Sequence, residues 1–300
     1  GEFRHIHENM QGKSAYTAPF KVAVLSCWGA LRGWMSNQVH HSIWHREIYS
    51  YTGVLECLSG MPFDVEFITF DDIKNGIAED IKVIINSGDA YTAFSGGEYW
   101  TDETVLTNIR KFVDNGGGFI GVGEPTACQN QGRFFQLSDV LGVDREMTYS
   151  LSTDKYNELN RNHFILEDIE GDIDFGEGMS RIYAQGENYQ ILSMDKEYSQ
   201  LVVNDYGKGH GVYFAGLPYS PQNCRILLRA IYYAAGEIEE MKKFYVTNMD
   251  TEVAVFEKSG KIAVINNAKE PRKTDLYVNG ELFEKLELAE MEMRWVDYKA

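Results

Sequence analysis

The chain has 300 residues, of which 44% are apolar and 13% aromatic, so it can bury one large core and a second, smaller one. It carries 45 acidic against 28 basic residues, a formal net charge of −17. This balance argues against nucleic-acid and anionic-membrane partners, because both are held by basic surfaces. No segment has the length and apolarity of a bilayer span or a signal peptide, so we expect a cytoplasmic protein.

From residue 20 onward, short apolar segments alternate with amphipathic ones. Helical spacing of apolar residues predicts helices over residues 44–59, 101–114 and 221–235. Strands are predicted over residues 21–26, 63–69, 82–86, 118–122, 190–194, 200–204 and 211–216. Strands that alternate with helices over short links indicate a doubly wound α/β sheet, which we assign to residues 20–240.

The pattern changes after a charged junction at residues 237–243. Only strands are predicted beyond it, and Asn279-Gly280 is the dipeptide favoured in a tight hairpin turn. We therefore expect a small all-β antiparallel domain over residues 241–300. Residues 1–19 lack an initiator Met and are expected to form a lead-in or linker, so that the chain is a piece of a larger protein. The six C-terminal strands are predicted over residues 244–248, 252–257, 261–266, 273–278, 282–288 and 292–296.

A glycine-rich stretch, VDNGGGFIGVGEP at residues 113–125, contains the letters of a dinucleotide-binding fingerprint. That fingerprint requires a strand before the glycines and a helix after them, whereas here a predicted helix precedes and a predicted strand follows. Glycine after the last turn of a helix commonly ends it. We therefore expect a helix end followed by a buried strand, and no cofactor.

The end of that strand, Gly121-Val122-Gly123, resembles the first half of the nucleophile elbow of class I glutamine amidotransferases. Gly123 stands where those enzymes carry their cysteine, and glycine has no side chain that could attack a carbonyl. Cys128 lies five residues further on, and its spacing does not make it a substitute. The resemblance implies an amidotransferase-like (flavodoxin-like) domain that lacks a nucleophile.

Three segments at predicted strand ends carry candidate carbohydrate-facing or domain-facing residues. Tryptophan faces stack on sugar rings, while Arg and His donate hydrogen bonds to hydroxyl or phosphate oxygens. The alternative is that these aromatic residues pack against a neighbouring surface, and that the second segment is only a structured turn. The candidates are Trp28, Arg32, Trp34, His40, His41 and His45, then Asp89 and Tyr91, and finally Glu124.

Metal binding has little support in the sequence. His41 and His45 have the i, i+4 spacing of zinc ligands on a helix, but no third ligand is evident. The four cysteines form no CxxC pair, and most of them suit buried apolar positions. The acidic stretch 167–177 fails the EF-hand template and is expected to be a solvated loop, and the glycines of 207–211 suit a hairpin turn. We expect no metal site.

Four long sequence segments, in this order along the chain, resemble the 1,3-β-galactosyl-N-acetylhexosamine (lacto-N-biose) phosphorylases, a family that also includes galactosyl-rhamnose phosphorylases. They are SGMPFDVEFITFDDI, INSGDAYTAFSGGEYW, GGGFIGVGEPTACQNQGRFFQLSDVLGVDRE and GKGHGVYFAGLPYS. The resemblance implies a parent enzyme with a catalytic (β/α)8 barrel, then an amidotransferase-like domain, then a small β-domain. The barrel would carry the aspartate general acid, and this chain has no room for a barrel. No catalytic residue is therefore expected here.

The resemblance also implies the parent reaction, which is inverting phosphorolysis of a β-1,3-galactosyl-N-acetylhexosamine to galactose 1-phosphate. Galactoside and phosphate would bind mainly in the barrel. This chain would supply structure, homodimer contacts and one rim of the active-site mouth. The alternative is a free-standing amidotransferase-like protein that binds a carbohydrate or acts as a scaffold.

Overall fold

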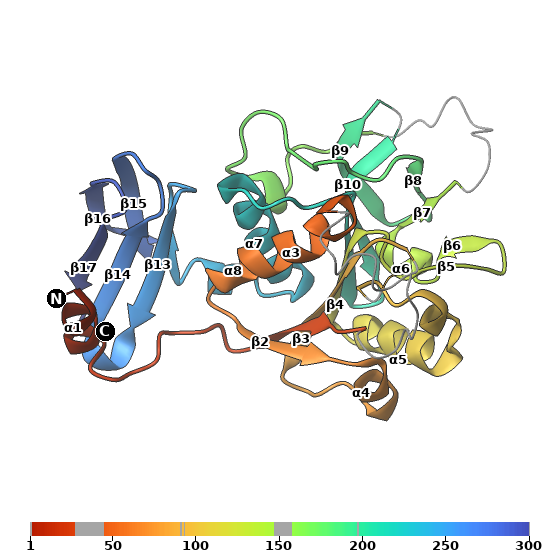
Figure 1. The fold of residues 1–300 in the computed structure, drawn as a ribbon, viewed down its shortest axis with the longest axis horizontal. Helices are drawn as coiled ribbons and strands as arrows, with labels where there is room; N and C mark the ends of the chain where they lie inside the picture. The colour runs from red at the N-terminus through yellow and green to blue at the C-terminus, as the bar shows by residue number, and fades with distance from the viewer. Residues whose placement is uncertain are drawn as a thin grey trace. The chain divides into compact units, whose positions relative to one another are not determined.

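The structure is a computed structural model that describes residues 2–27, 45–90, 92, 94–146, 158–196 and 198–299. The chain divides into two compact units (Figure 1). One comprises Phe20–Ser59 and Val65–Gly236, and we call it the α/β unit. The other comprises Gly1–Pro19, Gly60–Asp64 and Glu237–Ala300, and we call it the β unit.

A seven-stranded sheet with the order β2-β1-β3-β4-β11-β10-β9 forms the centre of the α/β unit (Figure 1). The neighbours β1 and β3, β3 and β4, and β4 and β11 are parallel, whereas β10 is antiparallel to both β11 and β9. All seven strands were predicted from the sequence. They are β1 Lys21–Leu25, β2 Asp64–Ile68, β3 Ile81–Gly88, β4 Gly118–Gly123, β9 Tyr189–Asp195, β10 Tyr198–Tyr206 and β11 Gly209–Phe214.

Helices cover both faces of this sheet. Helices α3 (His45–Ser59) and α7 (Pro221–Ala234) pack on each other and on β3 and β4, while α5 (Glu103–Asp114) and α6 (Ser138–Leu141) pack on β4 and β11 (Figure 1). A side chain at Gly118 would meet α7 and one at Gly121 would meet α6, which places the two groups of helices on opposite faces. The sheet is therefore covered on both sides, which explains why β3 and β4 are almost entirely buried.

Side-chain caps explain where the helices begin. The Asp102 carboxylate accepts the backbone N–H groups of Thr104 and Val105 at 2.9 and 3.3 Å and so caps the start of α5. Ser220 caps α7 in the same way. One helix, α4 (Phe70–Asn75), was not among the predicted helices, and it is held by a capping box in which Thr69 and Asp72 bind each other's backbone N–H groups. Six residues are too few to show helical periodicity.

Close approach of two backbones explains the glycine inside α3. A Cβ atom at Gly53 would lie 1.8 Å from the carbonyl oxygen of Leu217, in the segment that joins β11 to α7. The Ser50 hydroxyl, one turn earlier, accepts the backbone N–H of Leu217 at 3.4 Å. Helix α3 is therefore held against this segment by contacts that only glycine allows.

Several short elements between β4 and β9 were not predicted, because three or four residues carry no readable period. Strands β5 and β6 form one antiparallel pair, and β7 and β8 form another. A 3-10 turn, η2, also precedes α5. The short elements are η2 Gly97–Thr101, β5 Ala127–Asn130, β6 Arg133–Phe135, β7 Val143–Arg145, η3 Phe164–Leu166 and β8 Ile182–Ala184.

The β unit contains two three-stranded sheets, β12-β15-β16 and β13-β14-β17. The six predicted strands are all present, and their inward faces form an apolar core that includes Val255, Ile262 and Leu276. Asn279 and Gly280, with φ of 52° and 78°, make the predicted tight turn between β15 and β16. The elements are α1 Glu2–Met10, α8 Ile238–Met241, η4 Glu257–Ser259, β12 Phe244–Val246, β13 Thr251–Phe256, β14 Lys261–Asn266, β15 Arg272–Val278, β16 Glu281–Leu288 and β17 Met293–Asp297.

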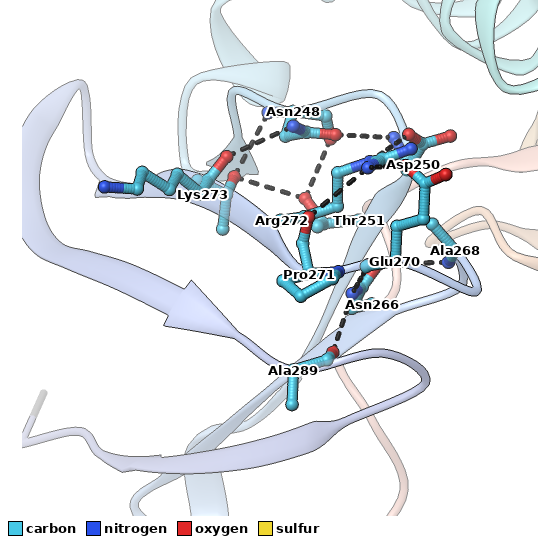
Figure 2. Close-up of polar contacts among 11 residues, drawn as sticks. Asn248, Asp250, Thr251, Asn266, Ala268, Glu270, Pro271, Arg272, Lys273 and Ala289 are labelled. Atoms are coloured by element: carbon cyan, nitrogen blue, oxygen red, sulfur yellow. Dashed lines mark hydrogen bonds and ion pairs between the residues drawn. The ribbon is translucent and has the colours of Figure 1, made fainter.

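A polar network fastens three loops at one end of the β unit (Figure 2). Arg272 pairs with Asp250 at 2.6 Å and with Glu270 at 3.1 Å, which joins the β12–β13 and β14–β15 loops. The Asn266 amide donates to the carbonyl oxygens of Glu270 and Ala289 at 2.8 and 2.7 Å, which adds the β16–β17 loop. These contacts replace water at loop backbone groups that would otherwise be unpaired.

Candidate functional site

The parallel strands β1, β3 and β4 bring their carboxyl ends to one edge of the sheet, the place where open α/β folds bind ligands. Cys27 follows β1, Asp89 follows β3 and Glu124 follows β4. We call the carboxyl ends of these strands, with the residues that contact them, the strand-end cluster.

Gly123 is the last residue of β4 and lies in the left-handed region with φ of 77°. A Cβ atom there would lie 3.2 Å from the carbonyl oxygen of Gly88, and the buried Tyr213 hydroxyl donates to the Gly123 carbonyl at 3.0 Å. Burial raises the pKa of Tyr213 far above its ordinary value, so this hydroxyl stays protonated. A turn and strand β5 follow Gly123, whereas a nucleophile elbow leads from a strand into a helix.

Glu124 is buried and its carboxylate is used by the protein itself. One oxygen accepts the backbone N–H of Ala90 at 2.7 Å, and the other pairs with the guanidinium of Arg145 at the end of β7. The Glu124 backbone N–H donates to the Gly88 carbonyl at 3.0 Å. Glu124 thus joins the ends of β3, β4 and β7, and its predicted contact with a ligand remains a prediction.

Asp89 begins a turn that two hydroxyl groups hold. Its carbonyl oxygen accepts from Thr92 Oγ1 at 2.7 Å and from the Ser95 hydroxyl. Behind this turn, the buried Asn86 amide donates to the Ser95 carbonyl at 3.3 Å and accepts the backbone N–H of Thr126 at 3.0 Å. Asn86 was not predicted as a site residue, although an amide inside the apolar strand KVIIN was a readable signal.

The aromatic and histidine candidates fall almost entirely outside the described residues. The chain segments that hold them are not described, and His45 is described only as the first residue of α3. Their predicted role on a carbohydrate-facing or domain-facing surface therefore remains a prediction. The undescribed candidates are Trp28, Arg32, Trp34, His40, His41 and Tyr91.

Two cysteines near the strand-end cluster are buried thiols. Burial raises the pKa of both Cys27 and Cys128, which keeps them in the weakly nucleophilic protonated form. Cys128 lies on β5, and its carbonyl accepts the Gln136 side-chain amide at 2.5 Å. Within the described ranges, no three His, Cys, Asp or Glu side chains come together as a metal site would require.

The acidic stretch at residues 167–177 is not simply a solvated loop, which corrects the sequence expectation. Asp168 accepts from Arg225 at 2.9 Å and from Arg229 at 2.8 Å, and both arginines are buried side chains of α7. Arg229 also pairs with Glu167 at 3.0 Å and lies 5.0 Å from the ring of Phe164. The loop is fastened to α7 because the two buried guanidinium groups need a carboxylate partner.

A polar hollow of about 330 Å³ opens beside this loop. Its wall carries the donor Arg161 and the acceptors Asp172 and Asp195, together with Ser193, whose hydroxyl donates to Gln200 at 3.1 Å. The hollow could not be predicted from the sequence, because its wall comes from β9, β10 and the loop before α7, which only the fold brings together. Its mixture of donors and acceptors suits a polyhydroxylated ligand.

The family follows from comparison with known proteins. Residues 21–240 match the lacto-N-biose phosphorylase central domain, and residues 244–296 match the lacto-N-biose phosphorylase C-terminal domain. The chain belongs to the lacto-N-biose phosphorylase family, as its sequence phrases predicted. Of the described helices, none combines the length and apolarity that a membrane crossing would need.

Individual members of the family are similar to this chain over nearly all of its length. The chain is 52% identical, over 92% of its length, to a 1,3-β-galactosyl-N-acetylhexosamine phosphorylase of Lachnoclostridium phytofermentans. It is 39% identical over 98% of its length to that enzyme of Bifidobacterium longum subsp. longum, and 33% identical over 95% to a D-galactosyl-β-1→4-L-rhamnose phosphorylase of L. phytofermentans. It spans 38%, 44% and 38% of these three relatives, about two-fifths of their length.

Solved structures with a similar fold include β-galactosidases. The cold-adapted enzyme of Rahnella sp. R3 gives a TM-score of 0.52 at 16% identity, with 94% of this chain and 41% of that chain covered. A catalytic mutant of the GH42 β-galactosidase of G. stearothermophilus gives 0.51 at 15% identity, with 99% and 43% covered. At such identity the likeness concerns the fold alone.

Proposed function

We propose that this chain is the central and C-terminal region of a 1,3-β-galactosyl-N-acetylhexosamine phosphorylase, and that it serves the reaction as a scaffold. The parent reaction would be inverting phosphorolysis, in which phosphate attacks the galactosyl anomeric carbon and an acid protonates the departing oxygen. The higher identity to phosphorylases of this specificity, 39–52% against 33% for the rhamnose enzyme, supports an N-acetylhexosamine acceptor.

The observation that carries the scaffold role is Gly123. By the resemblance of its motif, Gly123 would stand where an amidotransferase holds its nucleophile, and its backbone lies in the left-handed region without a side chain. The next residue, Glu124, is an acid whose carboxylate is paired with Arg145 and bound to a backbone N–H. A carboxylate held in this way supports rigidity at the strand ends better than proton transfer.

The same features support an amidotransferase-like, flavodoxin-like plan for the α/β unit. A parallel core of β1, β3, β4 and β11 lies between helices on both faces, and the strand before Gly123 is fully buried. The turn into β5, in place of a helix, is where this chain departs from that plan. We infer a domain that keeps the frame of the amidotransferase sheet and has a different connection at the elbow.

The scaffold would act through contacts with the rest of the parent enzyme. We propose that the strand-end cluster lies toward the catalytic barrel, with Asp89, Glu124 and the segment Trp28–His45 forming one rim of the active-site mouth. This chain would also supply contacts between the two subunits of a homodimer. Galactoside and phosphate would meet their reacting groups in the barrel.

The test uses the chain in two settings. The purified chain is incubated with lacto-N-biose and phosphate, and galactose 1-phosphate is measured; we expect none. The chain then replaces the matching region of the 52% identical L. phytofermentans phosphorylase. We expect this chimera to produce galactose 1-phosphate, whereas turnover by the chain alone, or an inactive but folded chimera, would overturn the proposal.

The polar hollow supports a second candidate function, which is carbohydrate binding by this chain alone. Its wall offers a guanidinium, two carboxylates and a hydroxyl to sugar hydroxyl groups. Titration calorimetry with galactose and N-acetylglucosamine tests it, with Arg161→Ala as the variant and Arg133→Ala, an exposed arginine of β6, as the control. A heat of binding that is lost in Arg161→Ala and retained in Arg133→Ala would support binding in the hollow. The absence of any heat of binding with the unaltered chain would exclude these two sugars as ligands.

A further inference from the structure

Two cysteines that are far apart in the sequence meet between α3 and α7. The Sγ atoms of Cys57 and Cys224 lie 3.0 Å apart, and both residues are free thiols. From the sequence, most cysteines were expected to be separate core residues, since no spacing rule pairs positions so distant. The fold places this pair where one bond would join the two helices that cover the same face of the sheet.

The two sulfur atoms are close because the helices that carry them are held in place. Gly53, one turn before Cys57, lies against the Leu217 carbonyl, and the Ser50 hydroxyl binds the Leu217 backbone N–H. Leu217 leads directly into α7, which carries Cys224 in its first turn. A disulfide bond is about 2.0 Å long, so the sulfur atoms need to approach by only about 1 Å.

We propose that Cys57 and Cys224 are a site of reversible oxidative modification, at which a low-molecular-weight disulfide converts the two thiols into an intramolecular disulfide. Cys57 is 2% exposed, whereas Cys224 is partly exposed, so the external disulfide reaches Cys224 first. The hydrogen bond to Cys224, and then burial, raise the pKa of Cys57, which keeps Cys57 protonated until the second step.

The exchange balances in two steps. The Cys224 thiolate attacks one sulfur of the external disulfide, forms a mixed disulfide and releases one small thiolate. Cys57 then loses its proton and attacks the Cys224 sulfur, which forms the Cys57–Cys224 bond and releases the second small thiolate. The two protons lost by the cysteines end on the two released thiols. Two cysteine thiols are oxidised and one external disulfide is reduced.

The bond would restrict the α/β unit as a whole. It would close the chain from residue 57 to residue 224, a span that contains most of the central sheet. Long closed loops lose the most freedom in the unfolded state, so the oxidised chain should resist unfolding more than the reduced chain. The disulfide would hold α3 against α7 even if the contacts within the strand-end cluster were broken.

The test treats the native full-length chain with oxidised glutathione. We expect loss of two of the four thiols in a titration under denaturing conditions, and one cross-linked peptide pair that contains Cys57 and Cys224. The Tm should rise by something on the order of 5–15 °C and return after dithiothreitol. A cross-link to Cys27 or Cys128, or four thiols that remain free after prolonged treatment, would overturn the proposal.

Two variants distinguish disulfide formation between Cys57 and Cys224 from independent modification of single thiols. Cys57→Ser should leave a stable glutathione adduct on Cys224, because no second thiol can displace it. Cys128→Ser, which removes a buried thiol on β5, should still form the cross-link as the unaltered chain does. A Cys57→Ser variant that remains free of adduct would contradict attack at Cys224. Should that variant fail to fold, the peptide map of the unaltered chain decides the question.

Discussion

Glu124 and Arg145 form an ion pair at the carboxyl edge of the central sheet, although Glu124 follows β4 and Arg145 ends β7, a three-residue strand that pairs with β8 outside that sheet. The guanidinium also lies 5.2 Å from the ring of Phe134. The pair therefore connects the parallel sheet to the segment of short strands that follows it. This connection allows a direct measurement of how much the strand-end cluster stabilises the fold.

Glu124→Gln should destabilise the α/β unit by roughly 1–3 kcal/mol, because the half-buried Arg145 loses its counter-charge while the side chain keeps its size. Urea unfolding followed by circular dichroism measures the change. The matched control is Glu66→Gln, which removes an exposed partner of Lys21 and should leave the unfolding midpoint unchanged. Equal midpoints for Glu124→Gln and the unaltered chain would show that the pair contributes nothing.

Gly53→Ala should destabilise the chain by more than about 3 kcal/mol or prevent folding, because the added Cβ would lie 1.8 Å from the Leu217 carbonyl oxygen. The direction of the change in stability is informative, because replacing glycine by alanine inside a solvent-exposed helix normally stabilises the helix by about 1 kcal/mol. Glu56→Ala, on the exposed side of α3, serves as control and should change the stability by less than about 0.5 kcal/mol. A Gly53→Ala variant that is more stable than the original chain would contradict the close approach.

Asp168→Asn should cost about 2–4 kcal/mol, since the change removes the shared carboxylate of two buried arginines, Arg225 and Arg229. The measurement is again equilibrium unfolding in urea. Asp172→Asn alters an exposed acid of the same loop and should have almost no effect. If both variants lost the same stability, the net charge of the loop would be responsible, and the specific pairs would not.

His163 should make stability depend on pH below about 6.5. Burial lowers the pKa of His163 from its ordinary value of 6.5, although the Asp205 carboxylate partly opposes this. Its Nδ1 also accepts the Ile165 backbone N–H at 3.2 Å, a bond that a protonated ring cannot make. Because the unfolded chain binds the proton more tightly, the stability contributed by neutral His163 is complete above pH 6.5 and decreases as the pH falls below it.

The measurement compares unfolding midpoints of the original chain and His163→Asn between pH 8 and pH 5. Asparagine keeps a cap at the start of η3 without a titrating group, so the original chain should lose stability relative to this variant as the pH falls. His7→Asn, at an exposed position in α1, should leave the pH profile unchanged. A constant difference between the original chain and His163→Asn over this range would count against the role of His163.

The sequence predicted most regular elements of this fold because their signals are local. Buried β-branched runs such as Lys21–Leu25, and caps such as Asp102, need only neighbouring residues to be recognised. The order of the strands could not be predicted, since β4 pairs with β11 only after a long intervening segment has been placed. The short helix α4 and the three-residue strand β7 were missed, because six residues are too few to show helical periodicity and three are too few to show the alternation of a strand.

The candidate site could be predicted only where it depends on strand ends. Asp89 and Glu124 follow predicted strands, so their place at one edge of the sheet could be inferred. Arg145, which completes the pair with Glu124, could not be inferred, because it comes from an unpredicted strand. Asp168 was taken as a solvated acid for a different reason, because its partners Arg225 and Arg229 lie 57 and 61 residues away on the predicted helix α7, and only the fold brings them together.

The pairing of β4 with β11 also has a consequence for biosynthesis. Gly118 pairs with His210, so the edge of the apolar strand β4 that faces β11 stays open while the ribosome makes the intervening residues. The α7 helix, which covers one face of the same strands, emerges later still. During this interval the nascent chain exposes an unpaired, apolar strand edge, the feature by which folding intermediates associate with one another. Chaperone demand during synthesis should therefore end only when residues beyond α7 have left the ribosome.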